Sequence, residues 1–167
     1  MRESLKMAVK TFEDRPVVAV ELGVAAGANA QKIFDNLNIK KLALIDNWNP
    51  AYNENCLDWL EETKRRFEGR ENVEIIRHEA ISAANLFDNN SIDYLYIDDN
   101  HAPMHVYKEL SAWYDKVKSG GIIAGHDWAD NGRASAGIIQ FCTERGISYS
   151  YAQNQGEQVA DWWFFKP

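Results

Sequence analysis

The order of two kinds of apolar segment constrains the fold of this chain more than any other feature of its sequence. Short apolar runs, typical of buried strands, alternate with segments in which apolar residues recur every three or four positions, as on one face of a helix. Such alternation predicts a parallel sheet whose strands are joined by right-handed helical crossovers. The first five predicted strands are Val17–Gly23, Leu42–Asp46, Val73–His78, Ile92–Asp98 and Ile122–Gly125.

The predicted helices lie between and beside these strands. The clearest begins at Pro103 and carries apolar residues at positions 106, 110, 113 and 117, a spacing that places them on one face. The adjacent glycines at positions 120 and 121 are expected to end this helix. The other predicted helices are Arg2–Phe12, Ala28–Leu37, Leu57–Phe67, Ala80–Phe87 and Ala134–Arg145.

Two further strand-like segments, Ile147–Ala152 and Asp161–Lys166, close the chain. Only eight residues separate them, too few for a helical crossover, so we expect the two strands to pair antiparallel. The sequence therefore predicts an α/β, Rossmann-like fold with a mixed seven-stranded sheet and helices on both faces. The 167 residues fit a single domain, residues 1–167, because domains usually have about 100–200 residues.

Charge and cysteine content exclude several classes of protein. The net charge is −7, from 18 basic and 25 acidic residues, which disfavours nucleic acid as the main partner because such binding depends on Lys and Arg. No apolar run approaches the ~18 residues of a membrane span. The charged N-terminal segment does not resemble a secretion signal, and Cys56 and Cys142 fit no zinc spacing. We therefore expect a reduced, cytoplasmic protein.

The segment VELGVAAGANA joins the first predicted strand to the helix that follows it. A dinucleotide-binding loop would need glycines where Ala25 and Ala28 stand, and the first of these normally lets the backbone approach a pyrophosphate. The alanines therefore argue against NAD. Glu21, two residues before Gly23, would repel a phosphate but suits a cationic ligand.

This E-x-G-x-A-x-G pattern resembles the cofactor loop of class I methyltransferases that depend on S-adenosylmethionine (SAM). SAM carries an ammonium and a sulfonium but no phosphate, so an acid at this place is electrostatically reasonable. The resemblance implies SAM as cofactor and S-adenosylhomocysteine (SAH) as product. The cofactor contacts it implies in this loop are Glu21, Gly23, Val24, Ala25 and Gly27.

Residues after the second and third strands complete the predicted cofactor site. Asp46 lies 19 residues after Gly27, where an acid accepts hydrogen bonds from ribose hydroxyls. We expect Trp48 to stack on the adenine or ribose. Glu79, followed by Ala80, stands where the superfamily often has an acid near the adenine amino group. The alternative is a glycine turn and solvated acids in an unrelated α/β domain.

Acidic and imidazole side chains also follow the fourth and fifth strands. Asp98 ends one strand and Asp127 lies at the end of the next. Because neighbouring strands are ~4.8 Å apart, both carboxylates are expected to converge at the carboxyl edge of the sheet. One or two carboxylates, with waters and substrate oxygens, are the usual ligands of Mg²⁺. His101 follows Asp98 by three residues, where a neutral imidazole can remove a hydroxyl proton.

The stretch IDYLYIDDNHAPMHVYKELSAWYDKVKSGGIIAGHDW resembles small metal-dependent O-methyltransferases, among them the macrocin and mycinamicin sugar O-methyltransferases and related rhamnosyl and cephalosporin-cluster enzymes. The resemblance spans Val17–Trp128. It implies methyl transfer to a hydroxyl of a small molecule such as a sugar or glycoside, with Mg or Mn bound. The metal ligands would be Asp98, Asp127 and His126. Asp98 would also contact the cofactor and act in catalysis, with His101 as base.

His126 departs from this family, because some members have an acid there. Adjacent strand residues point to opposite faces, so His126 and Asp127 bind one metal only if the strand has already ended. An imidazole ligand also shifts preference towards manganese, iron or zinc.

Blander interpretations of the same residues stay open. Asp98 and Asp127 are also explained as exposed acids at strand ends, and Asp99 and Asn100 as caps of the helix that begins near Pro103. Two other functions fit the same fold: a non-catalytic SAM-binding module and a nucleotide-dependent oxidoreductase. The sequence shows little material to cover the acceptor. The pocket is therefore either open to a large acceptor or covered by a second subunit of a homo-oligomer.

Overall fold

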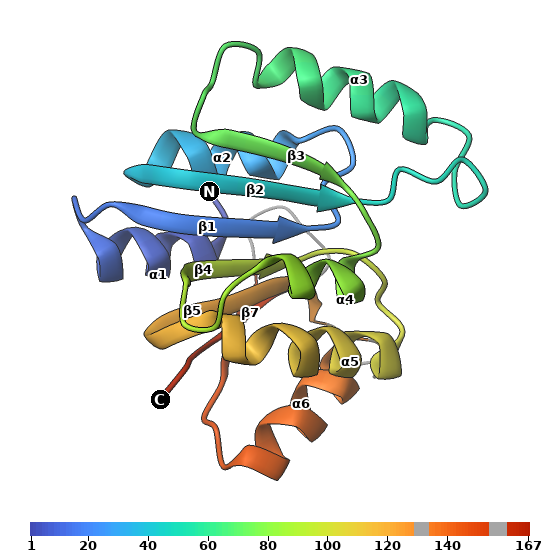
Figure 1. Cartoon of the computed structure of the whole chain (residues 1–167). Helices are drawn as coiled ribbons and strands as arrows, with labels where there is room; N and C mark the ends of the chain where they lie inside the picture. Colours follow the sequence, from blue (N-terminus) through green and yellow to red (C-terminus); the bar gives the residue numbers. More distant parts are fainter. Residues whose placement is uncertain (129–133, 154–159) are drawn as a thin grey trace.

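The computed structural model, which describes residues 1–128, 134–153 and 160–167, contains a seven-stranded sheet in the order β3-β2-β1-β4-β5-β7-β6 (Figure 1). Strands β1 to β5 are parallel to one another, and β7 is antiparallel to both β5 and β6. The predicted mixed sheet is confirmed. The strands are β1 (Val17–Leu22), β2 (Ile39–Asp46), β3 (Val73–Arg77), β4 (Ile92–Ile97), β5 (Val117–Trp128), β6 (Ser150–Gln153) and β7 (Ala160–Phe165).

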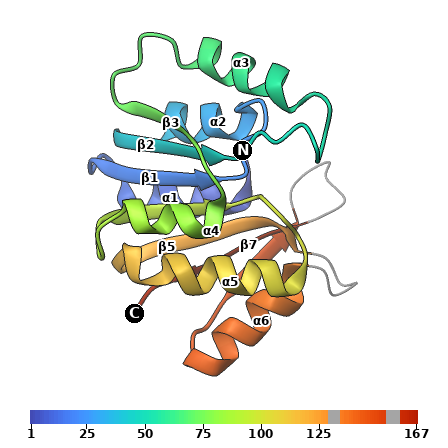
Figure 2. The ribbon, with the colours of Figure 1, turned by 45° about the vertical axis from the view of Figure 1, so that its right-hand side comes forward.

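Helices cover both faces of the sheet, as Figures 1 and 2 show. A buried apolar cluster lies on each face of the sheet. Helices α1, α2 and α3 pack on one face, and α4, α5 and α6 pack on the other. Strand β4 is buried along its whole length, as expected of a central strand covered on both sides. The helices are α1 (Glu3–Phe12), α2 (Ala28–Asn36), α3 (Cys56–Arg66), α4 (Ala80–Ala83), α5 (Pro103–Trp113) and α6 (Ala134–Arg145), with short 3₁₀ turns at Ala84–Leu86 and Tyr114–Lys116.

The fifth strand is longer at both ends than its sequence predicts. Val117 belongs to β5 and pairs with Ile92, whereas its spacing placed it on the preceding helix. That helix ends at Trp113, so the glycines expected to stop it lie inside the strand, where Gly120 has a φ of +73° beside a register shift. The helical spacing extended into a strand because a 3₁₀ turn joins the two without a break in the apolar pattern.

The last two strands also shift slightly. β6 begins at Ser150, because Ile147 instead packs into the core after α6 and bonds through its backbone to Cys142. Among the described residues, no helix combines the length and the apolar character that a membrane crossing requires.

Gly23, directly after β1, marks the closest approach between two central segments. Its φ is +77°, and a Cβ on it would lie 2.2 Å from the carbonyl oxygen of Asp98. Gly69 has a similar φ of +73° but has nothing within 4 Å of such a Cβ. Substitutions at these two glycines therefore distinguish the energetic cost of a left-handed backbone from the cost of a steric clash.

We expect Gly69→Ala to lower the free energy of unfolding by about 1 kcal/mol, the usual cost of a left-handed non-glycine residue. Gly23→Ala should lower it by roughly 1–3 kcal/mol more, because the backbone of Asp98 must move. Urea denaturation of both variants measures the difference. Equal losses would mean that the contact between Gly23 and Asp98 relaxes without cost.

Candidate active site

The loop after β1 is held over the sheet edge by Asp46. Gly23, Ala25 and Gly27 all have positive φ values, of 77°, 49° and 77°. Oδ2 of Asp46 accepts hydrogen bonds from the backbone N–H groups of Val24 and Ala25, at 3.0 and 2.9 Å. These bonds stabilise a turn that includes a non-glycine residue in a left-handed conformation. Carboxylate oxygens have further lone pairs, so Asp46 can also accept bonds from ligand hydroxyls.

A cavity of about 350 Å³ opens at the carboxyl ends of β1, β2 and β4. Five predicted cofactor residues line it: Gly23, Ala25, Asp46, Glu79 and Asp98. The volume lies at the lower end of the range for small-molecule sites, which is about 300–1,000 Å³. The rest of the wall comes from the loop after β2, from α3 and from the segment after β4, through Asn47, Tyr52, Asn53, Cys56, Trp59, Asp99, Asn100 and His105.

Trp48 does not stack where the sequence suggested. Its side chain is fully buried, and its Nε1 donates a hydrogen bond to the carbonyl oxygen of Ala25 at 2.8 Å. The ring therefore supports the loop from within and is not available to a ligand. Val24 and Ala80 are also buried, and Gly27 precedes the first residue of α2; none of these three lines the cavity.

Glu21 is buried beneath the same loop. Its Oε1 accepts a hydrogen bond from Nδ2 of Asn29 at 3.0 Å, and its Oε2 has no hydrogen-bond partner within residues 1–128, 134–153 and 160–167. Burial raises the pKa of this carboxyl group to about 8, and Asn29 opposes the shift. A cation in the cavity would favour the ionised form.

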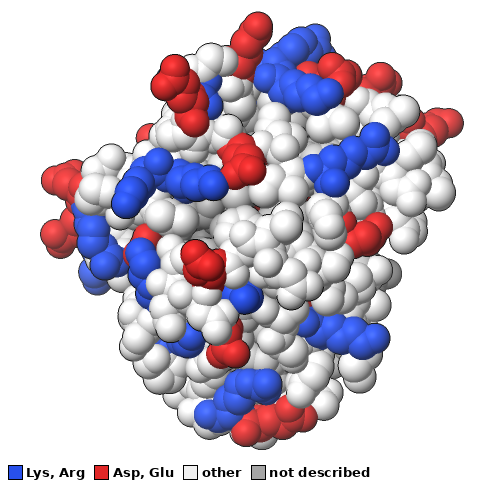
Figure 3. All heavy atoms as spheres, in the orientation of Figure 1, with Lys and Arg blue, Asp and Glu red and all other residues white. Residues whose placement is uncertain are grey.

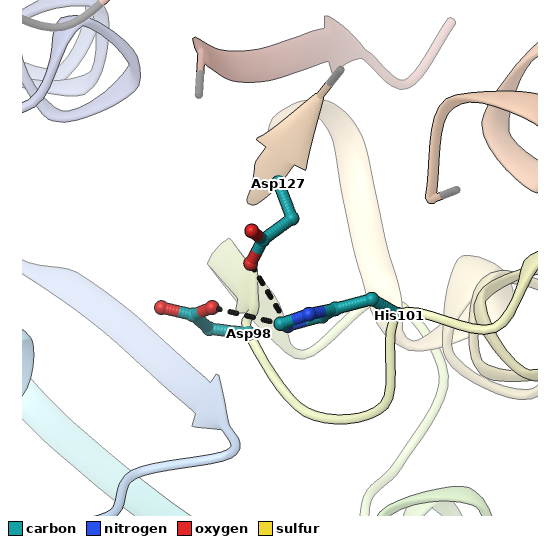
Figure 4. Close-up of side chains that lie close together, drawn as sticks. All are labelled: Asp98, His101 and Asp127. Atoms are coloured by element: carbon teal, nitrogen blue, oxygen red, sulfur yellow. Dashed lines mark ion pairs between the residues drawn. The ribbon is translucent and has the colours of Figure 1, made fainter. Parts of the chain in front are cut away.

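Asp98, His101 and Asp127 meet at the ends of β4 and β5 (Figure 4). Nε2 of His101 lies 2.9 Å from Oδ2 of Asp127 and 3.7 Å from Oδ1 of Asp98. The described residues thus bring together the acids and the imidazole that the sequence predicted as metal ligands and base. Because Asp98 also lines the cavity, this cluster adjoins the predicted cofactor site.

His126 joins this group because β5 is irregular at its end. Its Nδ1 lies 3.2 Å from Oδ2 of Asp127 and 3.8 Å from Oδ1 of Asp98. The strand alternation would separate two adjacent side chains, but Asp127 has a φ of 59° and the register shifts between Gly125 and Trp128. β5 runs on to Trp128, so the strand has not ended as the sequence argument required; the irregular backbone at Asp127 brings the two side chains together instead.

The charges of the cluster are tightly coupled. Hydrogen bonding of the His101 ring N–H to the carboxylates of Asp127 and Asp98 raises the pKa of His101 to about 10. The same hydrogen bond to His101, together with one to His126, holds the pKa of Asp127 well below its usual range. Without another cation, His101 is therefore an imidazolium at neutral pH. A dication beside the carboxylates would lower its pKa, because like charges oppose protonation.

Arg2 is the site residue that sequence reasoning missed. Its Nη1 lies 3.3 Å from Oδ2 of Asp98 and 3.8 Å from Oδ1 of Asp161, and it donates a hydrogen bond to the hydroxyl of Tyr96. Ser4, also in the N-terminal segment, donates through its hydroxyl to Asp161. Arg2 thus holds one oxygen of Asp98 and leaves the other facing the imidazoles. No local pattern links residues 96 positions apart.

Three further residues near the site have specific places. Oδ1 of Asn100 accepts a hydrogen bond from the N–H of Ala102 at 2.9 Å, one residue before α5, and among the described residues no side chain caps the helix itself, so neither Asn100 nor Asp99 does so. Asp99 instead faces His105, with its Oδ2 3.4 Å from Nε2 of His105. Trp128 is buried and stacks on Tyr151, with ring centroids 4.5 Å apart.

Comparison with known proteins shows which family the chain belongs to. A family model described as a methyltransferase domain matches residues 20–128. These residues run from β1 to the end of β5 and include both the cofactor loop and the acidic cluster. No curated protein matches the chain.

Solved methyltransferase structures share the fold. An rRNA methylase from Streptococcus thermophilus has 15% identity and a TM-score of 0.73 over 98% of this chain and 93% of its own. A protein from Streptococcus mutans assigned as a methyltransferase, solved with SAH, has 12% identity and a TM-score of 0.73 over 100% and 99%. Precorrin-6y C5,15-methyltransferase from Geobacter metallireducens has 14% identity and a TM-score of 0.72 over 97% and 87%. The Rossmann-like fold is therefore confirmed.

The raised pKa of Glu21 predicts a pH dependence of stability. Between the ordinary pKa of 4.5 and the folded value of about 8, the folded chain holds a proton that the unfolded chain has lost. Stability should therefore fall as pH rises through this window, by as much as about 1.4 kcal/mol per pH unit. Glu21→Gln should remove this part of the slope.

Urea denaturation from pH 5 to pH 8 measures the effect, with the exposed Glu54→Gln as the matched control. Burial also raises the pKa of Glu109, on α5, to about 7. Because Glu109 is unchanged in all three proteins, it adds the same pH dependence of stability to each. If the stability curves of Glu21→Gln and of the unaltered protein stay parallel, Glu21 does not carry the assigned proton.

Proposed function

Because the chain belongs to the methyltransferase domain family, we propose that it transfers the methyl group of SAM to a hydroxyl group of a small molecule, with a divalent metal, Mg²⁺ or Mn²⁺, at Asp98 and Asp127. The observation that carries this proposal is the convergence of two carboxylates and an imidazole beside the cavity. Both carboxylates come from the carboxyl edge of the sheet, where ligands bind in open α/β folds.

The lining of the cavity suits SAM. Asp46, Glu79 and Asp98 supply acceptors and negative charge, which fit the ribose hydroxyls and the cationic groups of a cofactor without phosphate. Hydrogen bonds from the backbone of Val24 and Ala25 already fix the side chain of Asp46, so little conformational entropy of this side chain is lost when a ribose binds. The buried Glu21 adds a carboxyl group whose ionised form a bound cation would favour.

The donor set at the strand ends fits a divalent metal. Carboxylates suit Mg²⁺ and Mn²⁺, and the nearby imidazoles favour Mn²⁺ of the two. Asp98 and Asp127 are the ligands we propose, with His126 at 3.8 and 3.2 Å from them as the third. When bound, such a metal lowers the pKa of the acceptor hydroxyl.

The transfer itself needs alignment and removal of one proton. The acceptor oxygen forms a bond to the methyl carbon while the carbon–sulfur bond breaks, its electron pair stays on sulfur, and SAH leaves. We assign the hydroxyl proton to Nε2 of His101, which lies 3.7 Å from Oδ1 of Asp98, a residue that lines the cavity. Holding both reactants in line supplies much of the rate in such a displacement. Arg2 orients Asp98 through its Oδ2.

A sugar or glycoside is the acceptor class we favour, in line with the sequence resemblance. The net charge of −7 disfavours RNA, although an rRNA methylase shares the fold. Figure 3 supports this choice for one face, where the described basic and acidic side chains are interspersed and form no broad basic field.

The first test is cofactor binding by calorimetry. We expect SAH to bind with micromolar affinity and NAD not to bind. Asp46→Ala should weaken SAH by about 1–3 kcal/mol through lost hydrogen bonds, while the exposed Asp115→Asn should leave it unchanged. Tight binding of NAD, or none of SAH, would overturn the assignment of the cavity.

The second test separates metal from cofactor. Asp127→Asn should abolish Mn²⁺-dependent methylation of glycoside acceptors, measured as SAH formed, and leave the affinity for SAH nearly intact, because Asp127 does not line the cavity. Asp98→Asn should also abolish this activity. Full activity of Asp127→Asn without added metal would refute the metal assignment. SAH binding without turnover of any acceptor would indicate a non-catalytic binding module.

A further inference from the structure

A second cluster of ionisable side chains lies on the other side of the chain that leaves β4. It consists of Asp99, His105 and Glu109, whose ligand atoms all lie within 4.8 Å of one another. His105 and Glu109 are four residues apart on α5, so they share one helix face. Asp99 and His105 line the proposed cofactor cavity, and Glu109 is buried one helical turn after His105. The transfer reaction proposed above uses none of the three.

Glu109 is the observation that points to a ligand. Its side chain is fully buried, yet among the described residues neither of its carboxylate oxygens has a hydrogen-bond partner. Nε2 of His105 is likewise buried and has no hydrogen-bond partner in the part of the chain that the structure describes. Because buried carboxylates are normally paired or bound to a metal, a group that satisfies these atoms together would remove the cost of burying them.

The spacing of the atoms suits a metal better than direct hydrogen bonds. Nε2 of His105 lies 3.4 Å from Oδ2 of Asp99 and 3.6 Å from Oε1 of Glu109. Hydrogen bonds between nitrogen and oxygen are usually about 2.7–3.2 Å long. Two ligands that each lie ~2.0–2.1 Å from a tetrahedral zinc ion are about 3.4 Å apart. His105 therefore lies at nearly the spacing of zinc ligands from each carboxylate, and the ligand atoms of the two carboxylates lie within 4.8 Å of each other.

We propose that Asp99, His105 and Glu109 bind a transition-metal dication, with Zn²⁺ as the ion that fits best. Two carboxylates and one imidazole are ligands of zinc, and three protein ligands leave a position open. That position faces the cavity, because Asp99 and His105 line it. Two ionised carboxylates balance the charge of the dication, so the occupied site is neutral and does not repel a cationic cofactor.

The site can be tested on the full chain after removal of metals with EDTA. Every protein in this test carries Asp127→Asn, which weakens metal binding by the first cluster of Asp98, His101 and Asp127. Failure of this proposal is therefore distinct from failure of the proposed transfer reaction. Calorimetric titration with Zn²⁺ should then show one equivalent bound to Asp127→Asn. Adding His105→Asn or Glu109→Gln should weaken this binding at least tenfold.

The matched control is His78→Asn, which removes an exposed imidazole outside the cluster and should leave Zn²⁺ binding unchanged. Circular dichroism checks that each variant folds. If Glu109→Gln does not fold, His105→Asn decides, since His105 is partly exposed.

Co²⁺ offers a second readout, because a tetrahedral site gives visible absorption bands that His105→Asn should abolish. Absence of Zn²⁺ binding by Asp127→Asn would overturn the proposal. Equal binding with and without His105 and Glu109 would do the same, because the ion would then lie elsewhere.

Discussion

The contact between Gly23 and the backbone of Asp98 sets the relative positions of both halves of the candidate site. β1 and β4 are neighbours in the sheet, and the N–H of Asp98 donates to the carbonyl of Leu22 at 2.8 Å. Because position 23 has no side chain, the loop after β1 can lie against the segment after β4. The cavity and the acidic cluster consequently share Asp98. A larger residue at position 23 would separate the cofactor loop from the carboxylate proposed to hold the metal.

Several acidic side chains surround this contact, and two of them are buried away from water. Glu21 and Glu109 are buried on opposite faces of the sheet, and burial raises the pKa values of both, to about 8 and about 7. Arg2 forms ion pairs with Asp98 and Asp161, whereas Glu109 has the imidazole of His105 3.6 Å away and Glu21 accepts a hydrogen bond from the neutral amide of Asn29. A cavity with this surrounding favours cationic ligands. Both kinds of ligand proposed here, a sulfonium cofactor and divalent metals, are cations and therefore fit this cavity.

The sequence predicted those parts of the site that follow from strand ends. The carboxyl edge of a parallel sheet gathers the residues after each strand, so Asp46, Asp98 and Asp127 could be placed together from alternation alone. Trp48 was misplaced because a short loop after β2 turns its ring inward, which depends on a hydrogen bond to Ala25 and not on spacing. Arg2 had no local signal, since its contact with Asp98 exists only once α1 packs beside β7 and β4.

Adjacent side chains point in different directions after β4 but in the same direction at the end of β5. This difference explains why the carboxyl edge of the sheet carries two clusters. After β4, Asp98 contacts Arg2 on the α1 side, whereas Asp99 faces His105 on α5, which covers the other side. The chain thus directs two neighbouring acids to two separate groups. At the end of β5 the left-handed backbone of Asp127 cancels the alternation, so His126 and Asp127 both turn towards Asp98. A single local change in φ therefore decides whether two adjacent side chains act at one site or at two.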